Sequence, residues 1–176
     1  MKIKQNKERG LIYIGADHAG FDLKQAIKKM LDKKEIKYVD MNEKKVEGDD
    51  YPDVAYLVAN AVSKDKTNKL RGILVCGSGV GMCIVANKVR GIRAATVYDK
   101  YSAVMSRKDN DTNVLCLRSR NMSQSRNLKF VKFWLNTYFS NAERHRRRIR
   151  KIEWLVFVWL NIPDQRFQIF SHAREI

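Results

Sequence analysis

Cysteine is scarce in this sequence. The three that occur, Cys76, Cys83 and Cys116, form no CxxC pair. This usage argues against a secreted domain held by disulfides and is typical of a protein kept in a reducing compartment. We therefore expect a cytoplasmic protein.

Histidine is equally rare, and long apolar runs are absent. His18, His145 and His172 lack the HxxxH spacing of a metal site, so no bound metal is expected. No apolar run approaches the ~18–20 residues that a membrane helix needs. The first ten residues, MKIKQNKERG, are basic and lack the apolar stretch of a signal peptide. We therefore expect neither export nor membrane insertion.

Acidic residues are outnumbered. The chain has 19 Asp and Glu against 35 Lys and Arg, a formal net charge of +16. Many lysines fall on amphipathic helical patterns, where they form a solvated face. The exception is RHRRRIRK at residues 144–151, a cluster suited to a phosphorylated small molecule or to RNA. No glycine–aromatic motif of an RNA-recognition module lies beside it, so nucleic acid is not the expected partner.

Strand-like apolar runs alternate with helical patterns along the chain. Because most of these runs are continuously apolar, the pattern predicts an α/β fold with helices on both faces of a parallel sheet. The expected strands cover residues 11–16, 36–40, 72–76, 92–97 and 113–117. The expected helices cover 21–34, 51–63, a segment ending near 88, 99–109, 124–139 and 142–152.

No linker divides the chain, so we expect one domain over residues 1–153. It includes a basic N-terminal extension at 1–10. Residues 154–176 form a C-terminal extension, first apolar and then polar, which we expect to pack on the domain or on a partner subunit.

Ligands of parallel sheets gather where strands end. Residues suited to catalysis or ligand binding flank three of the predicted strands. They lie in the segments Asp17 to Gly20, Cys76 to Gly81 and Asn110 to Asn113. A thiol at the carboxyl end of a strand, beneath the positive end of the next helix, suits chemistry on an anionic substrate. Together, on one rim of the sheet, these segments predict a site for a phosphate and a reacting carbon.

Each segment also has an ordinary explanation. The GSGVG turn can simply allow tight packing, Asp17 can cap the following helix, and an isolated buried cysteine is usually inert. The turn matches neither a nucleotide P-loop nor the dinucleotide fingerprint.

The combination of motifs is more specific than any one of them. In order from about Leu11 to Glu153 stand GADHAGFDLK, YPD after an acidic loop, ILVCGSGVGMCIVANKVRGIRAA, YSAVMSR, NDTNVLCL and RHRRR. Together they resemble the ribose-5-phosphate isomerase B family, which includes galactose-6-phosphate and allose-6-phosphate isomerases. The resemblance implies a Rossmann-like three-layer sandwich with a five-stranded parallel sheet. It also implies a homodimer or a tetramer with active sites shared between subunits, and no cofactor.

The resemblance assigns roles at the reacting end of the sugar. Cys76 would be the base that moves a proton between C1 and C2 through an enediolate. Asp17 would bind sugar hydroxyls close to that end. The enediolate oxygen would be stabilised by Ser78, Asn110 and the amides of Gly77, Gly79 and Gly81.

At the other end of the sugar, the resemblance implies a phosphate site. Its ligands would be His18, Arg120, Arg144 and Arg148, the last two from the partner subunit. Guanidinium groups suit a phosphate dianion, and this remote anchor orients the reacting carbon. Tyr51, in the Tyr-Pro pair, is expected to be structural.

Two residues depart from the family pattern. Asp109 stands where many relatives have a histidine that opens the furanose ring, so we expect either slower ring opening or use of the open-chain sugar. Arg118 stands where relatives usually have glycine. It could alter phosphate recognition, but we expect it to point into solvent.

The predicted function is interconversion of ribose 5-phosphate and ribulose 5-phosphate in the non-oxidative pentose phosphate pathway, with Cys76 as base. Two alternatives stay open. The substrate could be a six-carbon sugar phosphate, allose 6-phosphate or galactose 6-phosphate. Alternatively, the protein could be a catalytically weakened binder of sugar phosphate or RNA.

Overall fold

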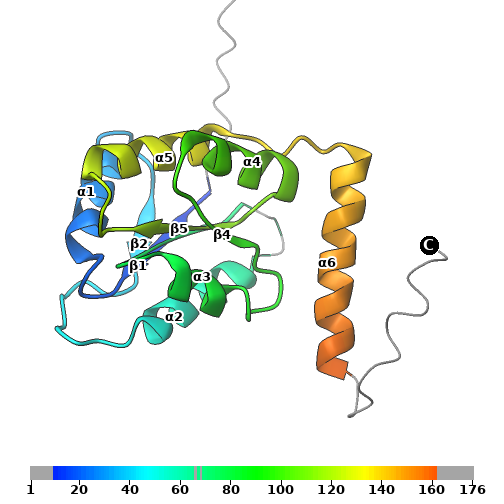
Figure 1. Cartoon of the computed structure of the whole chain (residues 1–176), viewed down its shortest axis with the longest axis horizontal. Coiled ribbons are helices and arrows are strands. Elements are labelled where there is room, and N and C mark those ends of the chain that lie inside the picture. Colours follow the sequence, from blue (N-terminus) through cyan, green and yellow to red (C-terminus); the bar gives the residue numbers. More distant parts are fainter. Residues whose placement is uncertain (1–9, 66, 68, 162–176) are drawn as a thin grey trace, which may run out of the picture. The chain divides into compact units, whose positions relative to one another are not determined.

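Five short apolar runs form strands, and the amphipathic segments between them form helices (Figure 1). The computed structural model describes residues 10–65, 67 and 69–161. The strands are β1 Ile12–Ala16, β2 Tyr38–Asp40, β3 Arg71–Cys76, β4 Ala94–Thr96 and β5 Val114–Arg118. The helices are α1 Phe21–Asp32, α2 Tyr51–Ser63, α3 Val80–Ala86, α4 Lys100–Asn110, α5 Gln124–Asn136 and α6 Glu143–Asn161. The predicted α/β fold with a five-stranded parallel sheet is confirmed.

All neighbouring strands are parallel, in the order β2-β1-β3-β5-β4. From β1 the chain first moves outward to β2, and then returns to the other side of β1 for β3. The strand order therefore reverses between β1 and β3. In open α/β sheets, ligands bind at such a point, beyond the carboxyl ends of the strands.

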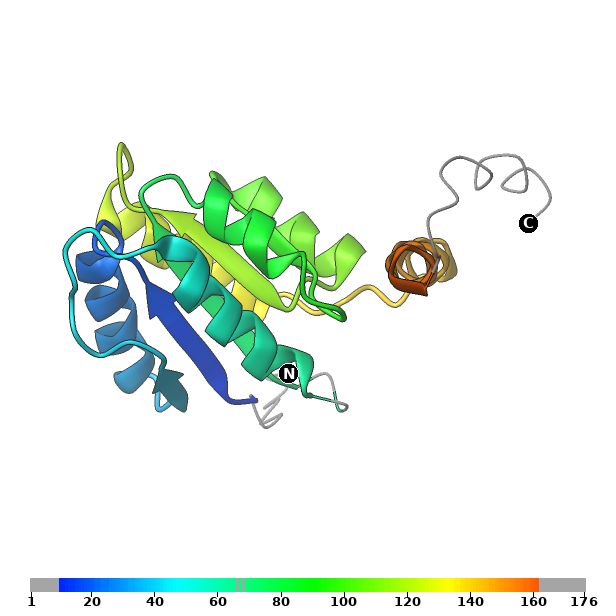
Figure 2. The ribbon, with the colours of Figure 1, turned by 90° about the horizontal axis from the view of Figure 1, so that it is seen from below.

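The helices cover both faces of the sheet. One core packs α1, α4 and α5 against side chains such as Ile14, Val75 and Leu117. The other packs α2 and α3 against Leu74, Val114 and other side chains of the opposite face. Figure 1 shows the two helical layers above and below the sheet, and Figure 2 shows α2 and α3 in front of it. The three-layer arrangement follows from strands that are apolar on both sides.

The chain divides into two compact units, Met1–Asn141 and Ala142–Ile176. The first contains the sheet. In the second, the described part is the single helix α6, basic in its first turns and followed by exposed Ile152, Trp154 and Leu155. A single domain over 1–153 stays a prediction. Most of the 1–10 extension and the tail from residue 162 lie outside the described residues.

Candidate active site

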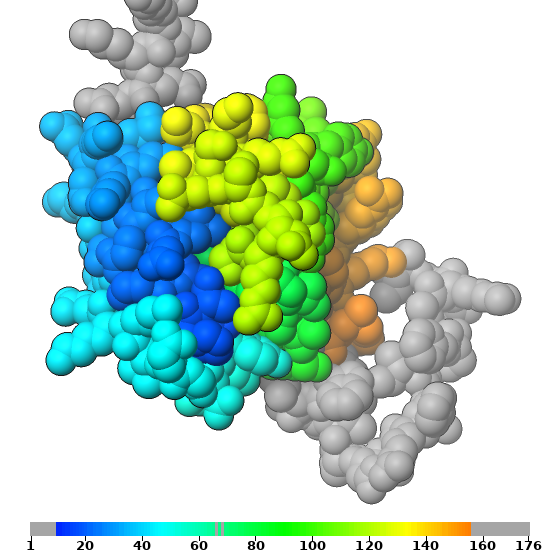
Figure 3. All heavy atoms as spheres, turned by 60° about the vertical axis from the view of Figure 1, so that its left-hand side comes forward, coloured from blue at the N-terminus to red at the C-terminus, as the bar shows by residue number. Residues whose placement is uncertain are grey.

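A pocket of about 640 Å³ lies beyond the carboxyl ends of β1, β3 and β5. Its volume falls in the range typical of small-molecule sites. In Figure 3 the β1–α1 connection (blue), the loop before α2 (cyan) and the segment after β5 (yellow-green) meet on one face. The lining residues are Asp17, His18, Ala19, Tyr51, Cys76, Gly77, Ser78, Val80, Gly81, Ile84, Tyr98, Arg118, Arg120 and Asn121.

Cys76 is the last residue of β3 and lies at the wall of this pocket. It is only 4% exposed, and its Sγ accepts a hydrogen bond from the Gly79 amide at 3.0 Å. Gly79 has a φ of +80°, a conformation that glycine adopts without strain. This glycine folds the turn back over the sulfur, so a backbone N–H points at the position where a thiolate charge would form.

Two further glycines allow close approach of large side chains. A Cβ on Gly77 would lie 3.2 Å from the Arg120 Nε, so the guanidinium lies directly over the turn. A Cβ on Gly81 would lie 2.7 Å from the Tyr51 ring. The missing side chain at Gly77 lets Arg120 approach the turn after Cys76, and that at Gly81 lets Tyr51 pack against the start of α3.

Arg120 is held there by the backbone. The chain after β5 continues to pair with the turn after β3: the Ser119 amide donates to the Cys76 carbonyl at 2.9 Å, and the Arg120 amide to the Gly77 carbonyl at 3.1 Å. Cys76 and Arg118 are register partners on neighbouring strands. The thiol and the guanidinium of Arg120 are thus fixed by one local hydrogen-bond pattern.

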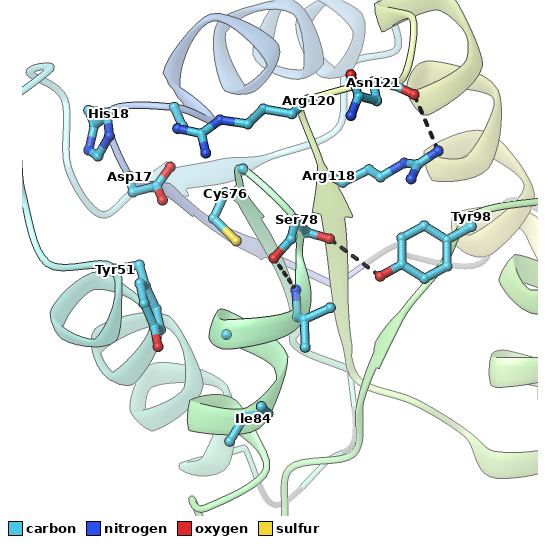
Figure 4. A pocket seen from close by; sticks show the side chains of 14 residues that line it. Asp17, His18, Tyr51, Cys76, Ser78, Ile84, Tyr98, Arg118, Arg120 and Asn121 are labelled. Atoms are coloured by element: carbon cyan, nitrogen blue, oxygen red, sulfur yellow. Dashed lines mark hydrogen bonds between the residues drawn. The ribbon is translucent and has the colours of Figure 1, made fainter.

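Asp17 and His18 follow β1 on the other side of the pocket. The Asp17 Oδ1 accepts from the Gly20 amide at 2.8 Å, so this carboxylate orders the turn before α1. The Nδ1 of His18 lies 2.8 Å from the Asp49 Oδ1, which also accepts from the His18 amide at 2.8 Å. Figure 4 shows Asp17 and His18 on one side of Cys76 and Ser78 on the other.

Arg118 does not point into solvent, and that expectation is wrong. Its side chain lines the pocket, donates to the Asn121 carbonyl at 3.2 Å and lies over the Tyr98 ring at 5.1 Å (Figure 4). The Tyr98 hydroxyl in turn donates to the Ser78 carbonyl at 3.4 Å. A cation over an aromatic ring is a stabilising arrangement, so Arg118 braces Tyr98 beside the turn.

The structure does not bring all predicted site residues together. The expectation that Asn110 shares a rim with Cys76 is wrong within one chain, because Asn110 ends α4 just before β5 begins. Residues that precede a strand lie at the amino edge of a parallel sheet. At about 3.3 Å per residue, the steps from Val114 to Arg118 separate the two edges by ~13 Å. Asp109 lies in the same last turn of α4, away from the pocket.

Two other predicted phosphate ligands, Arg144 and Arg148, lie on α6 in the second unit. They are not among the residues that line the pocket of the first unit. Gly79 does not line it either, and acts through its amide on Cys76.

Sequence reasoning missed the roles of Asp49 and Tyr98. Asp49 comes from an irregular acidic loop, and Tyr98 lies two residues after the end of β4. A carboxylate near a candidate phosphate-binding histidine is a signal only once the fold brings the two together. Tyr98, by contrast, follows a strand and could have been selected by the rule that ligands bind at carboxyl ends.

The remaining thiols, Cys83 and Cys116, interact with each other. A hydrogen bond from Cys116 lowers the pKa of Cys83 to about 6, with contributions from Thr96 and Asn87. Complete burial raises the pKa of Cys116. Among the residues that the structure describes, no three His, Cys, Asp or Glu side chains gather into a group that could hold a metal ion.

With this fold and site, comparison with known proteins identifies the class. The ribose/galactose isomerase family model matches residues 12–152, most of the chain, so the protein belongs to this family. The predicted resemblance to ribose-5-phosphate isomerase B is thereby confirmed. The described residues contain no helix that is both long and apolar enough to cross a membrane.

Individual relatives agree. The chain is 44% identical over 142 residues to the probable ribose-5-phosphate isomerase B of Mycoplasma genitalium, covering 80% of this chain and 92% of that protein. The crystal structure of that organism's enzyme with bound ribulose-5-phosphate has a TM-score of 0.79 at 43% identity, covering 82% of this chain and 95% of the other. A D-erythrulose-4-phosphate isomerase of Pectobacterium atrosepticum is also 44% identical, over 132 residues, 74% of this chain and 86% of its own.

Proposed function

We propose that this protein is a cytoplasmic aldose–ketose isomerase that interconverts ribose 5-phosphate and ribulose 5-phosphate. One observation carries the proposal: a single pocket contains a thiol, a turn of backbone amides and a guanidinium within one hydrogen-bonded arrangement. The relatives named as ribose-5-phosphate isomerases support the five-carbon substrate.

In the proposed mechanism, the Cys76 thiolate removes the proton from C2 of open-chain ribose 5-phosphate. The electron pair of that C–H bond forms the C1–C2 double bond, and the charge moves to the C1 oxygen. Amides of the 77–81 turn and the Ser78 hydroxyl stabilise this enediolate, a contribution of about 2.7–4 kcal/mol per donor in comparable sites. The O2 proton is transferred to O1, directly or through solvent, which forms the C2 carbonyl, and Cys76 returns its proton to C1 to give the ketose.

The phosphate anchor supplies orientation. Arg120 and His18 come from opposite sides of the pocket, and both present nitrogen donors toward it. An anchor several bonds from the reacting carbon converts binding energy into correct placement of C2 at the thiol. Asp17 would accept hydrogen bonds from the sugar hydroxyls between the two ends.

We further propose that the active unit is a homodimer in which the partner supplies the remaining groups. These are Asn110, Asp109, Arg144 and Arg148. The position of Asn110 at the opposite edge of its own sheet supports this arrangement, because it cannot serve the pocket of its own chain. If a second copy of the chain supplies these residues to the pocket, each can fill the role predicted for it.

Asp109 would then act on the ring oxygen of the partner's substrate. A carboxylate is a poorer acid catalyst than a histidine for protonating the ring oxygen, so ring opening is expected to be slow. Asp109→His should therefore accelerate turnover of furanose-rich ribose 5-phosphate. Equal rates for both proteins would discard a role in ring opening.

The test of the main proposal is turnover of four-, five- and six-carbon sugar phosphates side by side. Cys76→Ala should lower kcat by about 100- to 10,000-fold, the usual contribution of a general base. Cys83→Ala is the matched control, since Cys83 does not line the pocket, and it should leave turnover near the wild-type value. A Cys76→Ala protein with undiminished isomerisation would refute the mechanism. A preference for a six-carbon sugar phosphate would mean that ribose 5-phosphate is not the main substrate.

A further inference from the structure

The last residue of β1 is held in an unusual way on the side facing β2. β2 ends at Asp40, which pairs with Ile14, and the Met41 amide donates to the Ile14 carbonyl at 2.9 Å. β1 continues to Ala16, beside β3 but without a strand on the β2 side. The Asn42 side chain takes the place of that strand: its Oδ1 accepts from the Ala16 amide at 3.1 Å, and its Nδ2 donates to the Ala16 carbonyl.

Asn42 is itself fixed by a buried charge. Lys24 of α1 is 0% exposed, and its Nζ donates to the Asn42 Oδ1 at 3.2 Å, to the Asn42 carbonyl and to the Asp40 Oδ1 at 2.8 Å. Burial lowers the pKa of Lys24, while the bond to Asp40 acts in the opposite direction. A buried ammonium is costly, and a methionine of similar length would fill this space without that cost. Filling space alone therefore does not explain a lysine here.

Asp17 and His18, the two proposed site residues after β1, directly follow the residue that Asn42 holds. Asp17 directly follows Ala16, and its amide donates to the Val75 carbonyl of β3 at 3.2 Å. The strand end is thus held by β3 on one side and by Asn42 on the other. We propose that Lys24 and Asn42 form a clamp that positions Asp17 and His18 for the sugar phosphate. As positioning residues, they act through the backbone and do not touch the substrate.

The inference rests on the proposed function, and the chain offers a matched control for it. Lys28, one turn further along α1, donates to the other oxygen of the same carboxylate, Asp40 Oδ2, at 2.7 Å. Its hydrogen bond goes to Asp40 and not to the clamp residue Asn42. Lys28→Met therefore removes one lysine–Asp40 bond and leaves the contacts of Asn42 in place. Lys24→Met removes a lysine–Asp40 bond and the lysine's hydrogen bonds to Asn42 as well.

The test compares Lys24→Met, Asn42→Ala and Lys28→Met. Asn42→Ala is included because it leaves the Lys24–Asp40 ion pair in place, so we expect it to fold even if Lys24→Met does not. In the two clamp variants, the KM for the best sugar phosphate should rise about 10-fold or more, because a misplacement of ~1 Å can cost about 100-fold in activity. Lys28→Met should change stability but not KM. Loss of folded molecules lowers the maximal rate and leaves KM unchanged, so KM separates positioning from stability.

Hydrogen exchange gives a second measurement that needs no activity. The Ala16 amide should exchange at least about fivefold faster in Asn42→Ala than in the wild type, since one hydrogen bond is lost. Unchanged KM in a folded Asn42→Ala protein, or unchanged exchange at Ala16, would overturn the clamp. A wild-type protein that isomerises no sugar phosphate refutes the proposed function instead, and the exchange rate still shows whether Asn42 holds the strand end.

Discussion

At the residue scale, the three thiols occupy different environments within a short stretch of the fold. Cys76 lines the pocket, Cys116 is fully buried in β5, and Cys83 is partly exposed on α3. Asn87 donates to the Cys83 Sγ at 3.6 Å. The thiol with the lowered pKa is thus not the one proposed as the base, and chemical modification should distinguish the two.

Cys83 should react with iodoacetamide already near neutral pH. Because the hydrogen bond from Cys116 lowers the pKa of Cys83 to about 6, its thiolate should form as the pH rises through that value. The measurement is alkylation against pH by mass spectrometry in a Cys76→Ala background. Adding Cys116→Ala removes the donor and should move the midpoint toward the ordinary value of about 8.5. A midpoint near that value before this change would contradict the assignment.

A second residue-scale prediction concerns the loop carboxylate that holds His18. Asp49→Ala removes two acceptor contacts, one from the His18 ring and one from its amide. The histidine then loses its fixed orientation, so KM should rise about 5- to 10-fold, equivalent to ~1 kcal/mol for the lost hydrogen bonds. Steady-state kinetics checks this.

Asp50→Ala is the matched control for Asp49→Ala. Asp50 is the neighbouring carboxylate and the N-cap residue of α2, yet its side chain makes no cap hydrogen bond. Its removal should leave KM nearly unchanged. Equal effects of the two substitutions would point to loss of local negative charge rather than to loss of the His18 contact.

At the element scale, the glycine turn decides how α3 packs on α2. Gly81→Ala would place a methyl group 2.7 Å from the Tyr51 ring, and Tyr51 belongs to the first turn of α2. Overpacking of this kind costs about 1–3 kcal/mol. Urea unfolding should show that loss, and the double variant Gly81→Ala with Tyr51→Ala should recover part of it. Absence of recovery would show that Tyr51 is not the obstacle.

Most elements could be predicted from the sequence to within a few residues. The exception is α6, predicted over 142–152, which continues to Asn161. Residues 51–63 form α2 as expected, whereas α3 ends at Ala86 rather than near 88, and β2 and β4 are shorter than predicted. Apolar runs reveal strands because burial on both faces demands them. The ends of strands depend on hydrogen bonds to neighbours, such as Asn42 in place of β2, and these are set by tertiary contacts.

The candidate site could be predicted in part. The rule that ligands bind at the carboxyl ends of parallel strands selects the residues at or after the ends of β1, β3 and β5. These are Asp17, Cys76 with the glycine turn, and Arg120, and they do line one pocket. Asn110 precedes a strand, and the same rule places it at the other edge. The contact of Arg118 with Tyr98 depends on strand order, because β5 lies between β3 and β4. Apolar patterning does not encode that order.

At the scale of the whole molecule, the pocket and two of the residues expected to complete it belong to different compact units. The pocket of the sheet unit is lined by the thiol and by two guanidinium groups, Arg120 over the turn and Arg118 over the Tyr98 ring. Arg144 and Arg148 belong to the other unit. A phosphate dianion is best neutralised by several cations, so the proposed shared site would give the arginines of α6 a role in phosphate binding.

Mixing two inactive proteins should restore activity if subunits share sites. Cys76→Ala and Asn110→Ala should each be nearly inactive alone. After equal mixing, unfolding and refolding, a hybrid dimer has one site with both native residues and one with neither. Because half of the dimers are hybrids, activity should return to about one quarter of wild type. Mixing Cys76→Ala with Ser78→Ala is the control, since both residues line the same pocket and every site stays defective. No recovery in the test pair would place Asn110 outside the partner's site, and recovery in the control would show that regained activity does not report shared sites.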